Sequence, residues 1–120
     1  MQTFPYDREA ARAYARRWAF RRNPRYYDFE NIGGDCTNFA SQCIYAGAKV
    51  MNFTPTFGWY YRSVNDRAPA WTGVEYLYNF LVGNEGAGPF AEEKPLHALE
   101  IGDVVQLGRE TGDFYHSPVV

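Results

Sequence analysis

The segment Gly33–Phe39 constrains the fold of this chain more than any other stretch. Its two consecutive glycines interrupt regular structure, and Asp35 is a common helix-capping residue whose carboxylate would accept from the first free amides. From Cys36 to Ile44, apolar residues recur at the three- and four-residue spacing of a helix, and Gly47 supplies a stop. The sequence therefore predicts a helix that begins near Asp35 and carries Cys36 in its first turn.

This position of Cys36 favours a reactive thiol. The amino end of a helix is electropositive, and with a cationic neighbour it lowers a thiol pKa from about 8.5 by a unit or more. His116 is the obvious base to pair with it. The alternative is a structural role, since most cysteines are small buried hydrophobes, and we expect Cys43 to be one of these. The two cysteines are about 10.5 Å apart along the helix, too far for a disulfide.

Composition narrows the class of protein. The length of 120 residues suits one domain over residues 1–120, and the net charge of -2 argues against a nucleic-acid partner. No apolar run reaches membrane length and no export signal is evident, so we expect no membrane partner and a cytoplasmic location by default. If the parent protein is longer, the alternative is that it is secreted or located in the cell envelope. Two histidines and no Cys-x-x-Cys spacing predict no metal and no other cofactor.

Two further helices are expected around the cysteine helix. The first runs from Arg8 to Arg21 with Asp7 as its cap, and the second from Thr72 to Gly83 with the capping-box spacing of Thr72 and Glu75. The stretch 51–71 holds three prolines and no clean period, so it is expected to be mostly loop. The first helix is expected to bury Ala11, Tyr14, Ala15 and Trp18. Five arginines are expected to form a solvated face: Arg12, Arg16, Arg17, Arg21 and Arg22.

The C-terminal third changes character from helix to strand. The runs 104–107 and 114–120 are joined by a polar turn and predict a β-hairpin. Helices followed by strands indicate an α+β domain with helices packed on an antiparallel sheet. Because the run at 114–120 would leave an unpaired edge, we expect a partner strand to cover it, with a homodimer as one way to do so.

These features together resemble a known group of hydrolases. Asp35 to Phe39 is similar to the Asp-Cys-Ser/Thr opening of the papain-like NlpC/P60 and CHAP families, and 102–105 is similar to the Gly-Asp opening before their histidine strand. The ordered series 6–11, 33–43, 55–61 and 102–116 resembles the bacterial "putative amidase domain" family over nearly the whole chain. The resemblance implies a papain-like fold, with the N-terminal helices packed on a C-terminal sheet that here would lack its last strands.

The resemblance also implies cysteine-dependent hydrolysis of an amide or peptide bond, with peptidoglycan-derived peptides among the candidate substrates. Cys36 would attack the carbonyl carbon, and His116 would accept its proton and return it to the leaving amine. Asn31 is a candidate second oxyanion donor, although a turn role fits it equally well, and Asp35 is a candidate support for the same site. We find no third residue to orient His116.

A binding module is the alternative function. It would keep the groove of a papain-like scaffold without turnover, and would take a peptide or a glycan. Tyr27, Trp59 and Tyr60 are the candidate groove residues. Aromatic side chains are also frequent in cores, so simple packing is the competing interpretation for these three.

Overall fold

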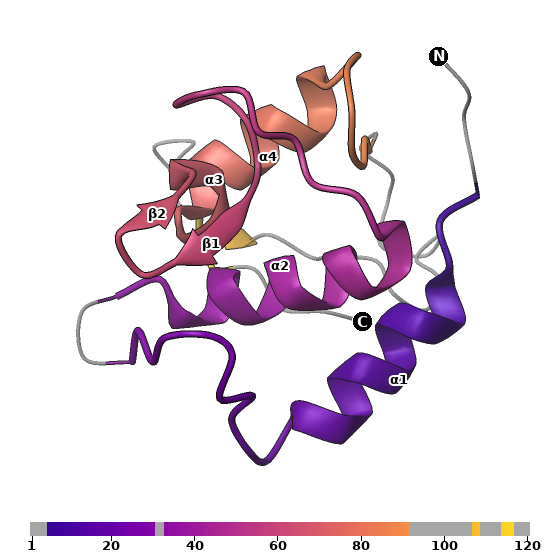
Figure 1. The fold of residues 1–120 in the computed structure, drawn as a ribbon, viewed down its shortest axis with the longest axis vertical. Helices are drawn as coiled ribbons and strands as arrows, with labels where there is room; N and C mark the ends of the chain where they lie inside the picture. Colours follow the sequence, from indigo (N-terminus) through magenta and orange to yellow (C-terminus); the bar gives the residue numbers. More distant parts are fainter. Residues whose placement is uncertain (1–4, 31–32, 92–106, 109–113, 117–120) are drawn as a thin grey trace.

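The computed structural model describes residues 5–30, 33–91, 107–108 and 114–116, the last two ranges as backbone only. Its elements are α1 (Arg8–Trp18), α2 (Asp35–Ala48), β1 (Tyr61–Ser63), β2 (Asp66–Arg67), α3 (Pro69–Thr72), α4 (Val74–Gly83), β3 (Leu107–Gly108) and β4 (Phe114–His116) (Figure 1). The expected mixed α+β class is confirmed. The strands are not confined to the C-terminal part, however, because β1 and β2 form a small antiparallel hairpin between helices.

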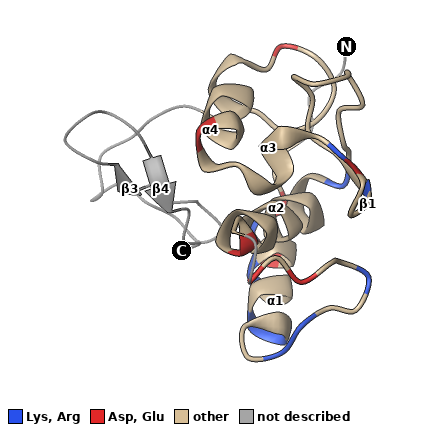
Figure 2. Ribbon diagram, turned by 90° about the vertical axis from the view of Figure 1, so that its left-hand side faces the viewer, with Lys and Arg blue, Asp and Glu red and all other residues tan. Residues whose placement is uncertain are grey.

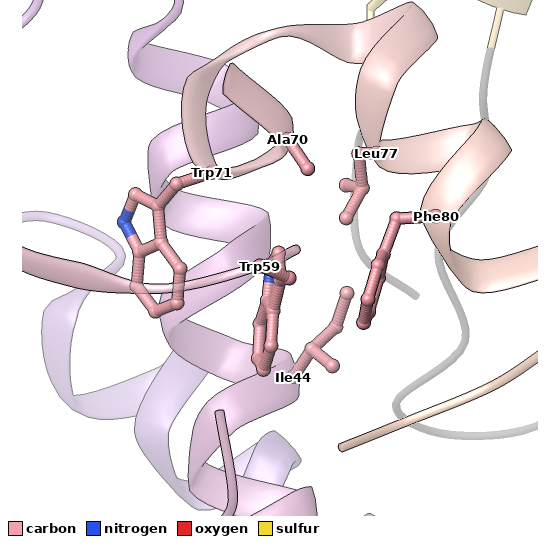
Figure 3. Packing of buried hydrophobic residues seen from close by; sticks show 6 residues of the cluster. All are labelled: Ile44, Trp59, Ala70, Trp71, Leu77 and Phe80. Carbon is pink, nitrogen blue, oxygen red and sulfur yellow. The ribbon is translucent and has the colours of Figure 1, made fainter. Parts of the chain in front are cut away.

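Helix α2 occupies the middle of the described structure. It packs against α1 on one side and α3 on the other, and α3 packs in turn on α4 (Figures 1 and 2). The core cluster gathers one side chain from α2, one from the segment before β1, and four from α3 and α4 (Figure 3). Its members are Ile44, Trp59, Ala70, Trp71, Leu77 and Phe80. At its centre the rings of Trp59 and Trp71 lie 4.8 Å apart.

Helix α1 begins where the sequence predicts and ends earlier. The Asp7 carboxylate accepts from the Ala10 N–H at 3.0 Å, which confirms the cap. The last helical residue is Trp18 rather than Arg21, because the chain turns there and the Arg21 N–H donates to the Trp18 carbonyl. Of the expected stripe only Ala11 is buried, while the other three members are half-buried.

Both ends of α2 differ in detail from the prediction. Its first residue is Asp35 as predicted, but the cap is Gly34, and the Asp35 carboxylate accepts from the preceding loop instead of capping the first amides of the helix. Gly47 does not stop the helix, which ends when Lys49 adopts a left-handed φ of 65° and donates its N–H to Tyr45. Gly47 instead allows Tyr6 to pack closely on α2, because a β-carbon there would overlap the ring of Tyr6.

The stretch 51–71 is mostly irregular, as expected, but it also holds β1, β2 and most of α3. Pro69 begins α3, and the Gly73 N–H donates to the Pro69 carbonyl at 2.8 Å. The capping box of Thr72 and Glu75 was wrong, since Thr72 is the last residue of α3 and Gly73 caps α4. The predicted end of that helix at Gly83 is confirmed.

Strands β3 and β4 pair antiparallel, with Leu107 opposite His116 and Gly108 opposite Phe114. This confirms the predicted hairpin in the part that is described. The backbone of β4 lies against α4. The remainder of the run to Val120, and with it the proposed edge and missing strands, falls outside the described residues.

Candidate active site at the start of α2

Cys36 is the second residue of α2 and its thiol is exposed. The first amides of a helix have no acceptor within it, so the N–H groups beside this thiol are available to a bound oxygen atom. The thiol borders an open depression of about 460 Å³. Residues that line it include Arg22, Phe29, Gly33, Asp35, Cys36 and Thr37. The sequence prediction of a cysteine in the first helical turn is confirmed.

The two glycines before the helix have different structural roles. Both have φ near +90°, where a side chain is strained: 86° at Gly33 and 89° at Gly34. A β-carbon on Gly34 would also lie 2.6 Å from the Thr72 carbonyl oxygen, whereas nothing lies within 4 Å of one on Gly33. Gly34 therefore lets the start of α2 pass close to the end of α3.

Asp35 joins the start of α2 to the preceding loop. Its carboxylate accepts from both terminal nitrogens of Arg22, at 2.9 and 3.2 Å, and from the Phe29 N–H at 3.2 Å. The Asn38 side-chain amide is a fourth donor, at 3.4 Å. Partial burial by itself would raise the pKa of Asp35, but these hydrogen bonds and the Arg22 charge outweigh it and lower the pKa. Asp35 is thus held as a carboxylate next to Cys36.

Arg22 is exposed, as expected, but it lies beyond the end of α1 and forms ion pairs rather than part of a helix face. Besides Asp35, its guanidinium contacts Asp28 at 3.2 Å and Glu30 at 3.6 Å. The hydrogen bonds with Asp35, followed by the charges of all three carboxylates, raise the pKa of Arg22. Sequence reasoning missed this residue because its main partner lies 13 positions away, which no local spacing reveals.

Buried polar residues of α2 connect the site to the aromatic core. Asn38 donates to the Tyr27 carbonyl at 3.3 Å and accepts from the Trp71 indole N–H at 3.0 Å. Ser41 donates to the Trp71 carbonyl and accepts from the Trp59 indole N–H. Asn38 thereby anchors the loop that carries Tyr27. These bonds position the amino end of α2 relative to the loop and the core.

The expected lowering of the Cys36 pKa was wrong for the surroundings that the structure describes. Partial burial, and then the negative charge of Asp35, raise the pKa of the thiol above its ordinary value. Arg22 does not act as the cationic neighbour, because three carboxylates share its charge. At neutral pH the thiol in this setting is protonated and needs a base to become a nucleophile.

Cys43 behaves as predicted. It is fully buried, and burial raises the pKa of its thiol to about 12. Neither Cys43 nor Cys36 is in a disulfide.

The aromatic groove candidates do not gather at Cys36. Trp59 is fully buried in the core, so its assignment to a groove was wrong. Tyr27 and Tyr60 are partly or largely accessible, but neither lines the depression beside Cys36. Tyr60 instead contacts Phe53, with ring centroids 5.5 Å apart, and the guanidinium of Arg62 lies over both rings.

Two candidate residues lie outside what the structure describes: Asn31, and the side chain of His116. No group of three or more His, Cys, Asp or Glu side chains within the described ranges is arranged to hold a metal ion. Of the helices in that part of the chain, none has the length and apolar character to cross a bilayer.

Comparison with known proteins matches residues 5–120 to the family described as "Putative amidase domain". The chain belongs to this family. The description of the amidase domain family points to amide hydrolysis. The uncharacterized protein YhbB of Bacillus subtilis (strain 168) is 31% identical over 122 residues, an alignment that covers 99% of this chain and 38% of the relative. No solved structure matches.

Proposed function

We propose that this member of the amidase domain family is a cysteine-dependent hydrolase that cleaves an amide or peptide bond. One observation carries the proposal: the exposed thiol of Cys36 stands in the first turn of α2, at an open depression and beside free helix amides. This is the arrangement a nucleophile needs, since the carbonyl oxygen of a substrate would meet those amides as it becomes negative.

The proposed reaction has two stages. His116 accepts the thiol proton, the Cys36 sulfur bonds to the carbonyl carbon, and the C–N bond then breaks while His116 protonates the leaving amine. Water hydrolyses the resulting thioester and restores the thiol. The raised pKa of Cys36 makes this base necessary. In the papain-like arrangement we propose, the strand that carries His116 would face the start of α2, with Asn31 as a second oxyanion donor.

A binding module is the second candidate, and the same raised pKa favours it. A thiol that stays protonated is a poor nucleophile, so the depression at Cys36 would bind a peptide or a glycan without cutting it. Both functions place the ligand at the same surface and differ only in turnover.

Hydrolysis of a panel of acylated amino-acid amides and peptidoglycan-derived peptides tests the proposal. Cys36→Ala is expected to lower kcat/KM by about 10³-fold or more, because it removes the nucleophile. His116→Ala should have an effect of similar size. Cys43→Ala is the matched control, since this second cysteine of α2 is buried and should leave kcat/KM unchanged.

Two results would decide against the hydrolase. Equal activity of wild type and Cys36→Ala would remove Cys36 from the mechanism. Binding of the peptides by both proteins, with no cleavage by either, would establish the binding module instead.

A further inference from the structure

A second depression lies between the end of α1, the loop that follows it and α2, with a volume of about 400 Å³. Residues that line it include Trp18, Arg22, Asp35, Asn38, Phe39 and Gln42. Arg22 and Asp35 also line the depression at Cys36, so the two hollows meet at this ion pair. The depression at Cys36 and the second depression are therefore neighbours, one on each side of the Arg22–Asp35 pair at the start of α2.

A directional chain of hydrogen bonds runs beneath the second depression. The Arg25 N–H donates to Oδ1 of Asn23 at 3.0 Å, which leaves the amide nitrogen of Asn23 to donate to the Tyr14 hydroxyl at 3.1 Å. Tyr14 in turn donates to Oε1 of Gln42. Burial raises the pKa of Tyr14 to about 12, so it keeps the proton that it donates. Each member of the chain thus determines how the next one is oriented.

This series of hydrogen bonds ends at the side-chain nitrogen Nε2 of Gln42, a donor that has no acceptor in the described part of the protein. Since Oε1 of Gln42 faces Tyr14, the two N–H bonds of Nε2 point elsewhere. Gln42 is only 6% exposed, and it lines the depression. Among the described residues, no buried side-chain nitrogen or oxygen lacks a hydrogen-bond partner. The Nε2 group of Gln42, for which no such partner exists there, must therefore reach the open space of the depression.

We propose that this depression is a substrate subsite in which Nε2 of Gln42 donates to a carbonyl oxygen of an extended peptide whose scissile amide lies at Cys36. The inference rests on the proposed function, and it specifies a peptide rather than a small amide as the substrate.

The dimensions and the walls of the subsite agree with a peptide. Gln42 lies six residues after Cys36, about 9 Å along the helix axis and about 120° around it, a path that roughly four residues of extended chain would span. Trp18 and Phe39 form aromatic walls, each with its ring centroid 6.3 Å from that of Tyr14. A donor between apolar walls suits a backbone carbonyl flanked by an apolar side chain.

The experiment uses the Cys36→Ala chain, which cannot cleave its ligand, and the capped peptide acetyl-Leu-Ala-Ala-amide. Titration is followed by NMR of the Gln42 side-chain NH₂ resonances. These are expected to shift and to saturate together with the binding curve. Gln42→Glu keeps the acceptor for Tyr14 and removes the donor, and should weaken Kd by about 3- to 10-fold. Gln42→Met removes the donor without adding charge and should weaken Kd similarly.

Cys43→Ala is the matched control in the same background. Cys43 lies on the same turn of α2 but lines neither depression, so its variant should bind the peptide with unchanged Kd. Absence of binding, binding that leaves the Gln42 resonances unmoved, or a Kd for both Gln42 variants equal to that of the Cys36→Ala parent would overturn the subsite. The resonances are measured in a chain that keeps Gln42, so the test does not depend on the variants folding.

The outcome for the subsite is separable from that for the enzyme. Hydrolysis by the wild-type chain with no response at Gln42 would overturn the subsite and leave the hydrolase. Binding that depends on Gln42, with no hydrolysis by wild type, would leave the subsite and overturn the hydrolase.

Discussion

The two cysteines of α2 differ in their exposure to solvent, although they belong to the same helix. Cys36 and Cys43 are seven residues apart and so lie on nearly the same face, yet Cys36 is exposed and Cys43 is fully buried. The difference comes from their position along the axis. The carboxyl-terminal half of α2 packs into the tryptophan cluster, while its first turn extends beyond the cluster to meet Arg22 and the preceding loop. The position along the helix axis therefore determines which of the two thiols is exposed to solvent.

The largest expected effect is on the tryptophan core against which the carboxyl-terminal half of α2 packs. Trp59→Ala should lower the free energy of unfolding by about 3–5 kcal/mol, because it empties the centre of the core. Tyr60→Ala, at the partly accessible neighbouring position, should cost well under half as much. Urea denaturation followed by circular dichroism measures both. Equal losses would contradict the assignment of Trp59 to the core and Tyr60 to the surface.

The comparison of the thiols themselves is tested by alkylation. In the folded protein, iodoacetamide should label Cys36 about 10³-fold faster than Cys43, since Cys43 reacts only when the core opens. Mass spectrometry of single-cysteine variants at pH 8 gives the two rates. In denaturant the rates should converge. Rapid labelling of Cys43 in the folded state would show that α2 is not packed as described.

The amino-terminal end of α2 is tested by substitution of the two glycines that precede it. Gly34→Ala should destabilise the protein by about 2–4 kcal/mol, because left-handed strain adds to a clash with the Thr72 carbonyl. Gly33→Ala has the strain alone and should cost about 1 kcal/mol. Thermal unfolding of both variants provides the comparison. A larger loss for Gly33→Ala would contradict the close approach of Gly34 to α3.

The smallest effect is expected from the charge beside Cys36. The lowered native pKa of Asp35 means that its carboxylate stabilises the fold above the unfolded pKa of about 3.9, and that this stabilisation disappears as pH falls through the native value. The stability difference between wild type and Asp35→Asn should therefore shrink on acidification.

The same variant should lower the pKa of Cys36, because the nearby negative charge is gone. Alkylation of Asp35→Asn near pH 7.5 should be up to several-fold faster than that of wild type. Asp66→Asn, in the exposed pair with Arg62, serves as the control and should leave the alkylation rate unchanged. An unchanged or slower rate for Asp35→Asn would contradict the charge effect.

Much of the fold was predictable from local patterns. The cap at Asp7, the helix start at Asp35, the end at Gly83 and the pairing of the last two strands each depend on residues close in sequence. The end of α2 was not predictable, because Gly47 serves contact with Tyr6 and not termination. The edge-strand homodimer stays a prediction, since residues 117–120 lie outside the described ranges.

The features of the candidate site likewise divide into those that local sequence predicts and those that depend on tertiary packing. Helical periodicity is a local property, so the sequence alone was enough to predict that Cys36 stands in the first turn of a helix and that Cys43 faces the core. The packing of the helices, by contrast, is what brings Arg22 to Asp35, buries Trp59 and places Gln42 at the edge of a depression. Those contacts join residues far apart in the chain, and their burial and charge balance exist only once α1, α2 and α3 have packed together.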